Sequence, residues 1–329
     1  MADLETAAVV VTAHGGTDVL DVQPRSVPAP QAGEVQVRVA ASGVNFVDVY
    51  ERQGVYPLPT PFVLGKEGAG EVIAVGAGVA DRLQVGDTVA WADVPASHSG
   101  IVNADADRLV RVPAGVSAET AAAAMLQGMT AHYLVTSTYT VQPGDVVLVH
   151  AAAGGVGQLL VQLATSRGAV VIGTVSTPEK AAIAEAAGAR EVIRYTAVDD
   201  LAAEVRRRNG GRGVAVVYDG VGQATFEASL ASLAPRGLLA LFGAASGRVP
   251  PFDLQRLNPA GSLFVTRPTL KHYTATRDEL LWRGGEVLTA VGDKALRVEI
   301  SARYPLSEAR AAYDALESRR TTGKLLLVP

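Results

Sequence analysis

The stretch that decides the fold is A-A-A-G-G-V-G at residues 151–157. An apolar run, V-V-L-V-H at residues 146–150, comes directly before it, and an amphipathic segment, Q-L-L-V-Q-L-A at residues 158–164, comes directly after it. A buried strand, a tight glycine turn and the start of a helix in this order are typical of a dinucleotide-binding site. We therefore expect the turn to bind the phosphates of a nucleotide cofactor.

The glycines of this turn have different expected roles. Gly154 lies where the backbone must approach a pyrophosphate closely, and Gly157 lies where helix and strand must pack with no Cβ between them. The helix N-terminus then offers its free N–H groups to the anion. Ala152 stands where the strict G-x-G-x-x-G fingerprint has its first glycine, so the match is partial. The residues expected to contact the cofactor here are Ala153, Gly154, Gly155, Val156 and Gly157.

Strand and helix patterns alternate after the turn. Further short segments rich in β-branched residues predict buried strands at residues 168–176, 191–195, 214–219, 238–243 and 262–266. Helix-like patterns fill the first three gaps, as in P-E-K-A-A-I-A-E-A-A-G, where Pro178 suits the first helical turn and Gly188 the C-cap. Continuous apolar strands that alternate with helices predict a parallel sheet covered on both faces. The fold class is therefore α/β, a doubly wound Rossmann domain; the alternative is an α/β domain whose glycine turn is only structural.

The first 125 or so residues are organised differently. Short alternating segments at residues 34–43, 68–76 and 85–91, separated by Pro and Gly, predict an antiparallel, barrel-like β domain. A helical pattern begins at residues 117–126, with Ser117 as N-cap and Thr120 in the first turn. We expect this helix to lead into the nucleotide-binding domain.

After Thr266 the chain is expected to return to the first domain. Residues 304–319 predict a capped amphipathic helix, and K-L-L-L-V-P at residues 324–329 predicts a final strand. A split domain would then enclose an inserted one, with residues 1–127 and 269–329 forming the outer domain and residues 128–268 the nucleotide-binding domain.

Composition is that of an ordinary globular enzyme. The 329 residues are 48% hydrophobic and 19% charged, and they suffice for two domains with cores of their own. The absence of cysteine excludes disulfides, thiolate metal sites and cysteine nucleophiles. The acidic start, M-A-D-L-E-T, lacks the plan of a signal peptide, and no apolar run is long enough to span a membrane. We expect a cytoplasmic protein.

Charge gives little reason to expect a nucleic-acid partner. The net charge of −4 provides no general attraction to phosphate backbones. The basic run at residues 206–208 is interpreted as a solvated helix end.

Four segments together carry a family resemblance. They are S-G-V-N-F-V-D-V-Y at residues 42–50, P-F-V-L-G-K-E-G-A-G-E-V at residues 61–72, the glycine turn, and V-T-R-P-T-L at residues 265–270. The chain resembles the medium-chain dehydrogenase/reductase superfamily and, within it, the zinc-independent NADPH:quinone oxidoreductases that include zeta-crystallin. The resemblance runs over nearly the whole chain, and it implies a Rossmann domain inserted in a GroES-like, mainly antiparallel β-barrel domain.

The resemblance also bears on metal binding. Zinc alcohol dehydrogenases of the superfamily have Cys and His where this chain has Asn45 and Lys66, and an amide and a cation cannot replace a thiolate and an imidazole. We therefore expect no metal. Glu67 remains from the zinc pattern, either as a buried carboxylate paired with a cation or in a catalytic role. The five histidines, His14, His98, His132, His150 and His272, show no ligand spacing and are expected to be structural.

The end of the second strand of the Rossmann pattern predicts the cofactor. NAD-binding enzymes have an acid about 20 residues beyond the glycines to bind the ribose 2′-OH. This chain has Ser176 there, followed by Thr177 and Lys180, and two hydroxyls with an ammonium suit a 2′-phosphate. Tyr195 resembles the family's tyrosine on the adenosine side. The expected cofactor is NADP(H).

The resemblance places further residues around the nicotinamide. Phe242, Gly243 and Ser246 would form the loop under the ring, and Val265 and Arg267 would border the same pocket. The residues implied to be catalytic are Asn45, Tyr50, Tyr56 and Thr130. Tyr50 and Tyr56 could equally be core aromatic residues. Hydride transfer needs a dry, oriented pair of reactants more than it needs a general acid.

Three functions stay open on the sequence. The first is an NADPH-dependent quinone reductase, and the second is a reductase of enones or enoyl thioesters with a tyrosine as proton donor. The third is a non-enzymatic nucleotide- or RNA-binding protein, against which the acidic charge balance weighs. The expected partner is a small-molecule quinone or another conjugated electrophile. The apolar sixth strand at residues 262–266 would lie at a sheet edge, so we also expect a homodimer.

Overall fold

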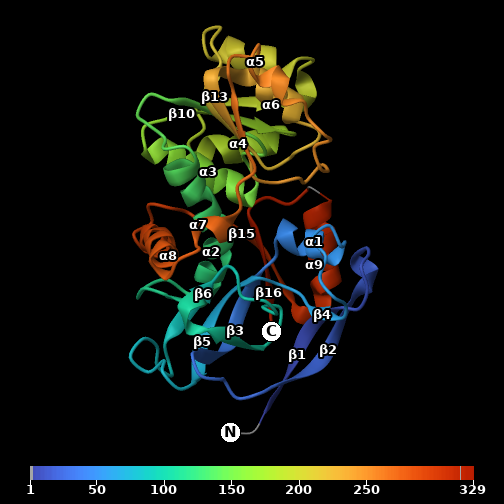
Figure 1. Cartoon of the computed structure of the whole chain (residues 1–329), viewed down its shortest axis with the longest axis vertical. Coiled ribbons are helices and arrows are strands. Elements are labelled where there is room, and N and C mark those ends of the chain that lie inside the picture. The colour runs from blue at the N-terminus through green and yellow to red at the C-terminus, as the bar shows by residue number, and fades with distance from the viewer. Residues whose placement is uncertain (1–2, 319) are drawn as a thin grey trace. The chain divides into compact units, whose positions relative to one another are not determined.

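The computed structural model describes residues 3–318 and 320–329, and the described chain divides into two compact units (Figure 1). Unit 1 comprises Met1–Met129 and Thr274–Pro329, and unit 2 comprises Thr130–Tyr273. The sequence predicts domain boundaries after residues 127 and 268. Each lies a few residues before the corresponding boundary in the structure. Arg319, the last residue of the expected C-terminal helix, and the first two residues of the acidic start lie outside the described residues.

Unit 2 has the predicted Rossmann sheet. Six strands pair in the order β11-β10-β9-β12-β13-β14 within its described residues, and every neighbouring pair is parallel. The order reverses at β9, which the glycine turn follows, as in other doubly wound sheets. The strands are β9 (Val146–Val149), β10 (Val170–Val175), β11 (Glu191–Arg194), β12 (Val214–Asp219), β13 (Leu233–Leu241) and β14 (Phe264–Thr266).

The helices of unit 2 lie where the sequence predicted them in the first three gaps. In α4, Thr177 is the N-cap, Pro178 opens the helix, and Gly188 follows its end with a φ of 109°. The basic run ends α5, as expected. The helices are α3 (Gly155–Ser166), α4 (Pro178–Ala186), α5 (Leu201–Arg208), α6 (Phe226–Ser232) and α7 (Leu270–Tyr273), with a π-helical turn at Leu134–Thr138.

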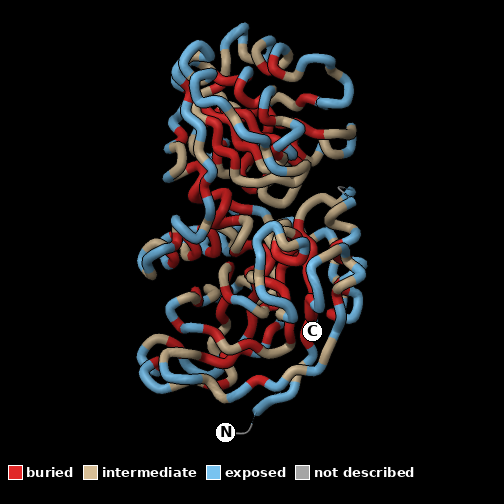
Figure 2. Tube along the Cα trace, turned by 45° about the vertical axis from the view of Figure 1, so that its right-hand side comes forward, coloured by how far each residue is buried: buried red, intermediate tan, exposed pale blue. Residues whose placement is uncertain are grey.

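The prediction of buried strands holds for the centre of the sheet and is wrong for β14. Side chains of β9, β10 and β12 are almost all buried, and Figure 2 shows the sheet interior in red. In β14, by contrast, Phe264 is 60% and Val265 37% exposed. The reason is position, because β14 is an edge strand and only the 3-10 turn Leu254–Leu257, no α-helix, lies between β13 and β14.

Unit 1 contains the predicted antiparallel β structure. A three-stranded sheet has the order β2-β1-β4, and a seven-stranded sheet has the order β15-β16-β3-β5-β6-β8 with β7 paired to β3, both counted over described residues. The strands are β1 (Leu4–Val11), β2 (Leu20–Val27), β3 (Glu34–Gly43), β4 (Phe62–Val63), β5 (Glu67–Val75), β6 (Thr88–Trp91), β7 (Ile101–Asp105), β8 (Val110–Arg111), β15 (Ile300–Pro305) and β16 (Lys324–Val328).

The helices of unit 1 correct one sequence prediction. The amphipathic helix expected from residue 304 starts only at Ala309, because residues 300–305 pair with β16 as β15 and Pro305 cannot donate a backbone hydrogen bond. Ser117 caps α2 through the Thr120 N–H, as predicted. The helices are α1 (Phe46–Arg52), α2 (Ala118–Tyr133), whose last four residues belong to unit 2, α8 (Arg277–Gly292), which the sequence patterns did not predict, and α9 (Ala309–Glu317). In the described part of the chain, no helix is long and apolar enough to cross a membrane.

Candidate functional site

The glycine turn has the geometry of a phosphate-binding loop. Gly154 is the N-cap of α3, and the backbone of Gly154 donates to the carbonyl of Ala151 at 2.8 Å. The first N–H groups of α3, from Gly155 to Gly157, lie in the turn that cannot find acceptors inside the helix. A Cβ on Gly157 would lie far inside van der Waals distance of the Ala151 carbonyl oxygen. The turn therefore fits a pyrophosphate at a helix N-terminus.

The departure from the strict fingerprint at Ala152 is compensated inside unit 2. Ala152 is fully buried, and a Cβ built on Gly173 of β10 would lie 2.8 Å from the Ala152 methyl group. The absence of a side chain on Gly173 therefore leaves room for the Ala152 methyl group. Ala153, the next residue of the turn, accepts a hydrogen bond from the Gln158 side chain at 2.9 Å.

The proposed 2′-phosphate residues lie together where β10 and β11 end. Ser176 and Thr177 directly follow β10, and Lys180 is in the first turn of α4. The Thr177 hydroxyl accepts the Lys180 N–H at 3.3 Å, so it serves as a helix cap. Partial burial lowers the pKa of Lys180. Tyr195, which is 49% exposed, begins a 3-10 turn directly after β11 instead of ending the strand.

A buried carboxylate holds the loops that follow β12 and β13. Asp219 Oδ1 accepts the N–H groups of Val221 and Gly222 at 2.8 and 3.0 Å, and its Oδ2 accepts the Ser229 hydroxyl at 2.7 Å. The Thr225 hydroxyl reaches both oxygens. Four donors on one carboxylate fix the conformation of residues 220–225.

The loop that carries Phe242, Gly243 and Ser246 rests on that fixed segment. The backbone of Phe242 donates to the Asp219 carbonyl at 2.9 Å, and the Ser246 hydroxyl donates to the Val221 carbonyl at 2.8 Å. A side chain on Gly243 would collide with the Gly220 carbonyl. Arg267, beyond β14, donates to the carbonyl of Leu241 at 3.0 Å, and Val265 lies within β14. These residues therefore gather at the carboxyl ends of β13 and β14, whose strands pair side by side.

Three of the four residues implied to be catalytic lie on helix α1 of unit 1 or next to it. Asn45 is its N-cap, Tyr50 lies within it, and Tyr56 follows it. The Tyr50 and Tyr56 rings meet edge to face with centroids 5.4 Å apart, and the Tyr56 N–H donates to the Tyr50 carbonyl at 3.1 Å. Tyr56 is 44% exposed, so it is not a core aromatic residue. Thr130 lies on α2 and is buried.

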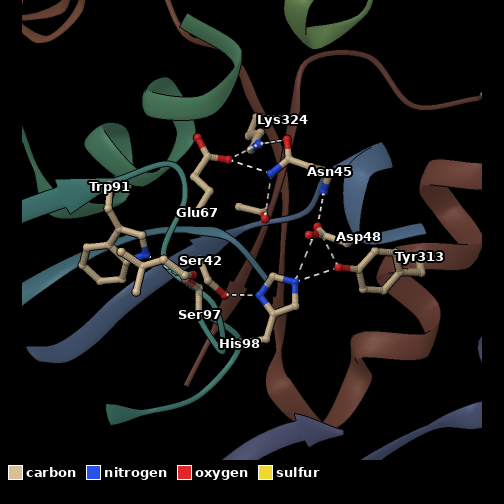
Figure 3. Close-up of polar contacts among 11 residues, drawn as sticks. Ser42, Asn45, Asp48, Glu67, Trp91, Ser97, His98, Tyr313 and Lys324 are labelled. Atoms are coloured by element: carbon tan, nitrogen blue, oxygen red, sulfur yellow. Dashed lines mark hydrogen bonds and ion pairs between the residues drawn. The ribbon is translucent and has the colours of Figure 1, made fainter. Parts of the chain in front are cut away.

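Every polar group of the Asn45 side chain is hydrogen-bonded to another residue of unit 1 (Figure 3). Its Nδ2 donates to the Gly43 carbonyl at 3.0 Å and to Glu67 Oε2 at 2.8 Å. Its Oδ1 accepts from Lys324 Nζ at 2.7 Å. Both amide hydrogens are used by the protein, so the Asn45 side chain has none left to donate to a substrate.

Glu67 is paired with a cation, the first of the two roles considered from sequence. Lys324 Nζ lies 2.5 Å from Glu67 Oε2, and both side chains are almost completely buried. Lys66 instead contacts Glu51 at 3.2 Å. Two basic side chains and an amide thus occupy this region, and in the described chain no group of three His, Cys, Asp or Glu side chains could bind a metal ion.

A second buried chain of hydrogen bonds reaches α1 through its backbone (Figure 3). Ser42 contacts His98 Nδ1 at 2.8 Å, His98 Nε2 contacts the Tyr313 hydroxyl at 2.7 Å, and Tyr313 donates to Asp48 Oδ2 at 2.9 Å. Asp48 Oδ2 also accepts the Asn45 N–H at 2.8 Å. Burial raises the pKa of Asp48 to about 7 and lowers the pKa of His98 to about 3.

Sequence reasoning missed Lys324, Asp48, Tyr313 and Asp219. Asp48 stands three residues after Asn45, the spacing of a capping box, and this signal was available. Asp219 ends an apolar strand, which is also a local signal. Lys324 and Tyr313 have no such signal, because their partners lie more than 200 positions away in the chain.

Comparisons with known proteins agree along the whole chain. The family described as alcohol dehydrogenase GroES-like domain matches residues 31–143, and the family described as zinc-binding dehydrogenase matches residues 155–279. A quinone oxidoreductase of Pseudomonas aeruginosa is 45% identical over 319 residues, which cover 96% of this chain and 98% of that protein. A 2-haloacrylate reductase of a Burkholderia species is 41% identical over 330 residues, with 98% of each chain covered.

A solved structure extends this similarity to three dimensions. The Escherichia coli quinone oxidoreductase, crystallised in complex with NADPH, is 42% identical, with a TM-score of 0.95. The match covers 98% of this chain and 100% of that chain.

Proposed function

Because the chain belongs to the zinc-independent quinone oxidoreductases of the medium-chain dehydrogenase/reductase superfamily, we propose that it is an NADPH-dependent quinone reductase. The observation that carries this proposal is the similarity over almost the full length of both chains to enzymes named quinone oxidoreductase. NADPH, when bound, supplies a hydride. A quinone accepts the electrons into a conjugated ring that disperses the developing charge, so no metal is needed to stabilise an alkoxide.

Each cofactor-binding residue then has a physical task. The N–H groups at the start of α3 bind the pyrophosphate, and Ser176 with Lys180 and Tyr195 binds the 2′-phosphate, while Thr177 caps the helix that carries Lys180. The loop of Phe242, Gly243 and Ser246 supports the nicotinamide end. Val265 and Arg267 border the same region, where Arg267 is already held by the Leu241 carbonyl.

Helix α1 and the segment that follows it supply the groups that act on the acceptor. Tyr56 is exposed beside Tyr50, and the two perpendicular rings can hold a planar quinone and place a hydroxyl near its oxygen. Asn45 acts through its fixed position at the start of α1, since its amide hydrogens are already used. Thr130, on α2, completes the set of residues carried over by resemblance.

A reductase of polarised C=C bonds is the second candidate. The relative named 2-haloacrylate reductase favours it, because an acrylate offers a conjugated double bond to the same hydride donor. Such a reaction needs a proton at the α-carbon, which Tyr50 or Tyr56 would donate. A quinone needs its proton on oxygen, where water can supply it.

The test is a steady-state comparison of acceptors. We expect NADPH oxidation with 1,4-benzoquinone and naphthoquinones, unaffected by a chelator, and negligible activity with alcohols. Tyr50→Phe and Tyr56→Phe should each lower kcat more than they weaken NADPH binding. Rapid turnover of an enone with no quinone activity would transfer the protein to the second candidate, and no NADPH oxidation with either class would defeat both.

The proposed function also includes an oligomeric state and a cellular location. We infer a homodimer in which two β14 edges pair around a two-fold axis, since soluble proteins cover an exposed apolar edge such as Phe264 and Val265. Sedimentation at micromolar concentration should give a dimer, and Phe264→Lys should give a monomer. We infer a cytoplasmic location because the NADPH pool that the enzyme would use is intracellular.

A further inference from the structure

The buried ion pair of unit 1 connects the elements that carry the proposed catalytic residues. Lys324, Glu67 and Asn45 form a closed triangle, with Lys324 Nζ 2.5 Å from Glu67 Oε2 and 2.7 Å from Asn45 Oδ1. The third side is the 2.8 Å hydrogen bond from Asn45 Nδ2 to Glu67 Oε2. The relative exposure of the three residues is at most 4%. Solvent therefore does not compete for these contacts.

The backbone around the triangle is adapted to it. Gly43 ends β3 beside the pair, and a Cβ at this position would overlap Glu67 Oε2 and crowd Lys324 Cε. The chain thus leaves room for the charged groups by omitting a side chain. A merely accidental contact between two long side chains would not need this space.

The other oxygen of Glu67 reaches a second helix. Glu67 Oε1 accepts the backbone N–H of Leu126 at 2.6 Å, and Leu126 lies one turn before Thr130 on α2. Through Asn45, the same carboxylate is joined to the first residue of α1, and Tyr50 lies five positions further on. One carboxylate therefore contacts the beginning of α1 and the middle of α2.

We propose that Glu67 and Lys324 are positioning residues, which fix α1 and the part of α2 in unit 1 so that Tyr50 is held ready for the acceptor. This inference rests on the proposed function only for its effect on turnover. Glu67 must be a carboxylate because it accepts three donors with two oxygens, whereas an amide has one oxygen and adds donors of its own. Lys324 is then required because an unpaired charge in an apolar interior is strongly destabilising.

The decisive variant removes both charges together. Lys324→Met alone leaves Glu67 as an unpaired buried charge, and the protein could fail to fold for that reason. In the double variant Lys324→Met/Glu67→Gln both charges of the pair are removed, so we expect the melting temperature to be largely restored. The single oxygen of a glutamine can accept a hydrogen bond from Asn45 or from Leu126. The carboxylate accepts both, one on each oxygen. Positioning should therefore stay impaired although the fold is recovered.

The expected readouts separate positioning from stability. In the double variant kcat with 1,4-benzoquinone should fall at least tenfold, while the Kd of NADPH should change less than twofold, because the glycine turn belongs to unit 2. Hydrogen–deuterium exchange should rise in residues 46–56 and stay unchanged in residues 155–166. Lys294→Met, which removes an exposed lysine, is the matched control and should leave all of these values unchanged.

Two outcomes would overturn the inference. One is a double variant with wild-type kcat and wild-type exchange in α1. If the double variant does not fold, Asn45→Ala decides, because it keeps the ion pair and cuts its link to α1; unchanged exchange of residues 46–56 would then refute the proposal. The exchange measurement needs no substrate, so a wild-type protein that fails to reduce quinones would defeat the proposed function without touching this one.

Discussion

At Gly157 a single methyl group decides whether the glycine turn can form. A Cβ there would collide with the Ala151 carbonyl oxygen and approach Ala152 Cα to 2.9 Å, and both are backbone atoms that cannot rotate away. We expect Gly157→Ala to weaken NADPH binding at least tenfold and to lower the melting temperature. Titration of NADPH fluorescence measures the first effect.

A second glycine provides the control. Gly285 lies inside α8, and a Cβ there would meet nothing within 4 Å. Gly285→Ala should keep NADPH binding and stabilise the protein by about 0.5–1 kcal/mol, because alanine restricts the unfolded chain more than glycine does. Wild-type NADPH affinity in Gly157→Ala would contradict the assigned role of the turn.

Lys180 is the residue that we expect to discriminate NADPH from NADH. Lys180 lies in the first turn of α4, after the hydroxyl residues Ser176 and Thr177 and next to Glu179. One charge-assisted contact to a phosphate contributes about 1.5–3 kcal/mol. Lys180→Ala should therefore lower kcat/KM for NADPH at least tenfold and leave kcat/KM for NADH nearly unchanged. Equal use of the two cofactors by the wild-type protein would refute this expectation.

In each unit a series of buried hydrogen bonds stabilises an element that carries or adjoins proposed site residues. In both series a histidine joins two hydroxyl groups, and the last acceptor is an aspartate. In both, the aspartate accepts backbone N–H groups, at the start of α1 in unit 1 and in the loop after β12 in unit 2. Burial lowers the pKa of both histidines, which are therefore neutral donors and acceptors. The series are Ser42–His98–Tyr313–Asp48 and Thr174–His150–Ser229–Asp219.

Removing Asp219, the aspartate that ends the buried series in unit 2, should loosen the loops that follow β12 and β13. Asp219→Ala leaves four donors without their acceptor, and we expect a loss of more than about 3 kcal/mol in the free energy of unfolding. Asp219→Asn keeps one oxygen and should lose less. Urea denaturation measures both, with the exposed Asp199→Ala as control. Equal stability of the alanine and asparagine variants would contradict the role of the carboxylate.

For the whole molecule, the pKa shifts of two buried groups of unit 1, Asp48 and His98, act on stability in opposite directions. Asp48 has its pKa raised from 3.8 to about 7, so the folded state binds the extra proton and stability falls as pH rises from about 4 to 7. His98 has its pKa lowered from 6.5 to about 3, so the unfolded state binds the extra proton and stability rises with pH over about 3 to 6.5. The two effects largely cancel in the wild-type protein.

Asp48→Asn should expose the histidine effect. Relative to wild type, the variant should gain about 1.4 kcal/mol in the free energy of unfolding for each pH unit between about pH 4 and 7. An asparagine oxygen can still accept the Asn45 and Tyr313 donors, which share one oxygen of Asp48. Urea denaturation at pH 4.5, 5.5 and 6.5 measures the difference, with Asp293→Asn at the surface as control. A difference independent of pH would show that Asp48 does not titrate in this range.

The sequence by itself determined the Rossmann sheet, the glycine turn and the caps of α2 and α4. These features depend on residues within a few positions of one another, such as Ser117 with Thr120 at the start of α2. The parallel strands were equally predictable, because each carries its own apolar run. The likeness of four segments to one family added the expected domain plan and cofactor.

Only the tertiary structure decided where α9 begins and what surrounds Glu67. Residues 304 and 305 belong to a strand because β16 pairs with them. The partner of Glu67 is Lys324, 257 positions away. Such contacts form because the C-terminal strand returns to β3, and no local pattern encodes that return, since burial and charge pairing depend on which distant segments meet in space.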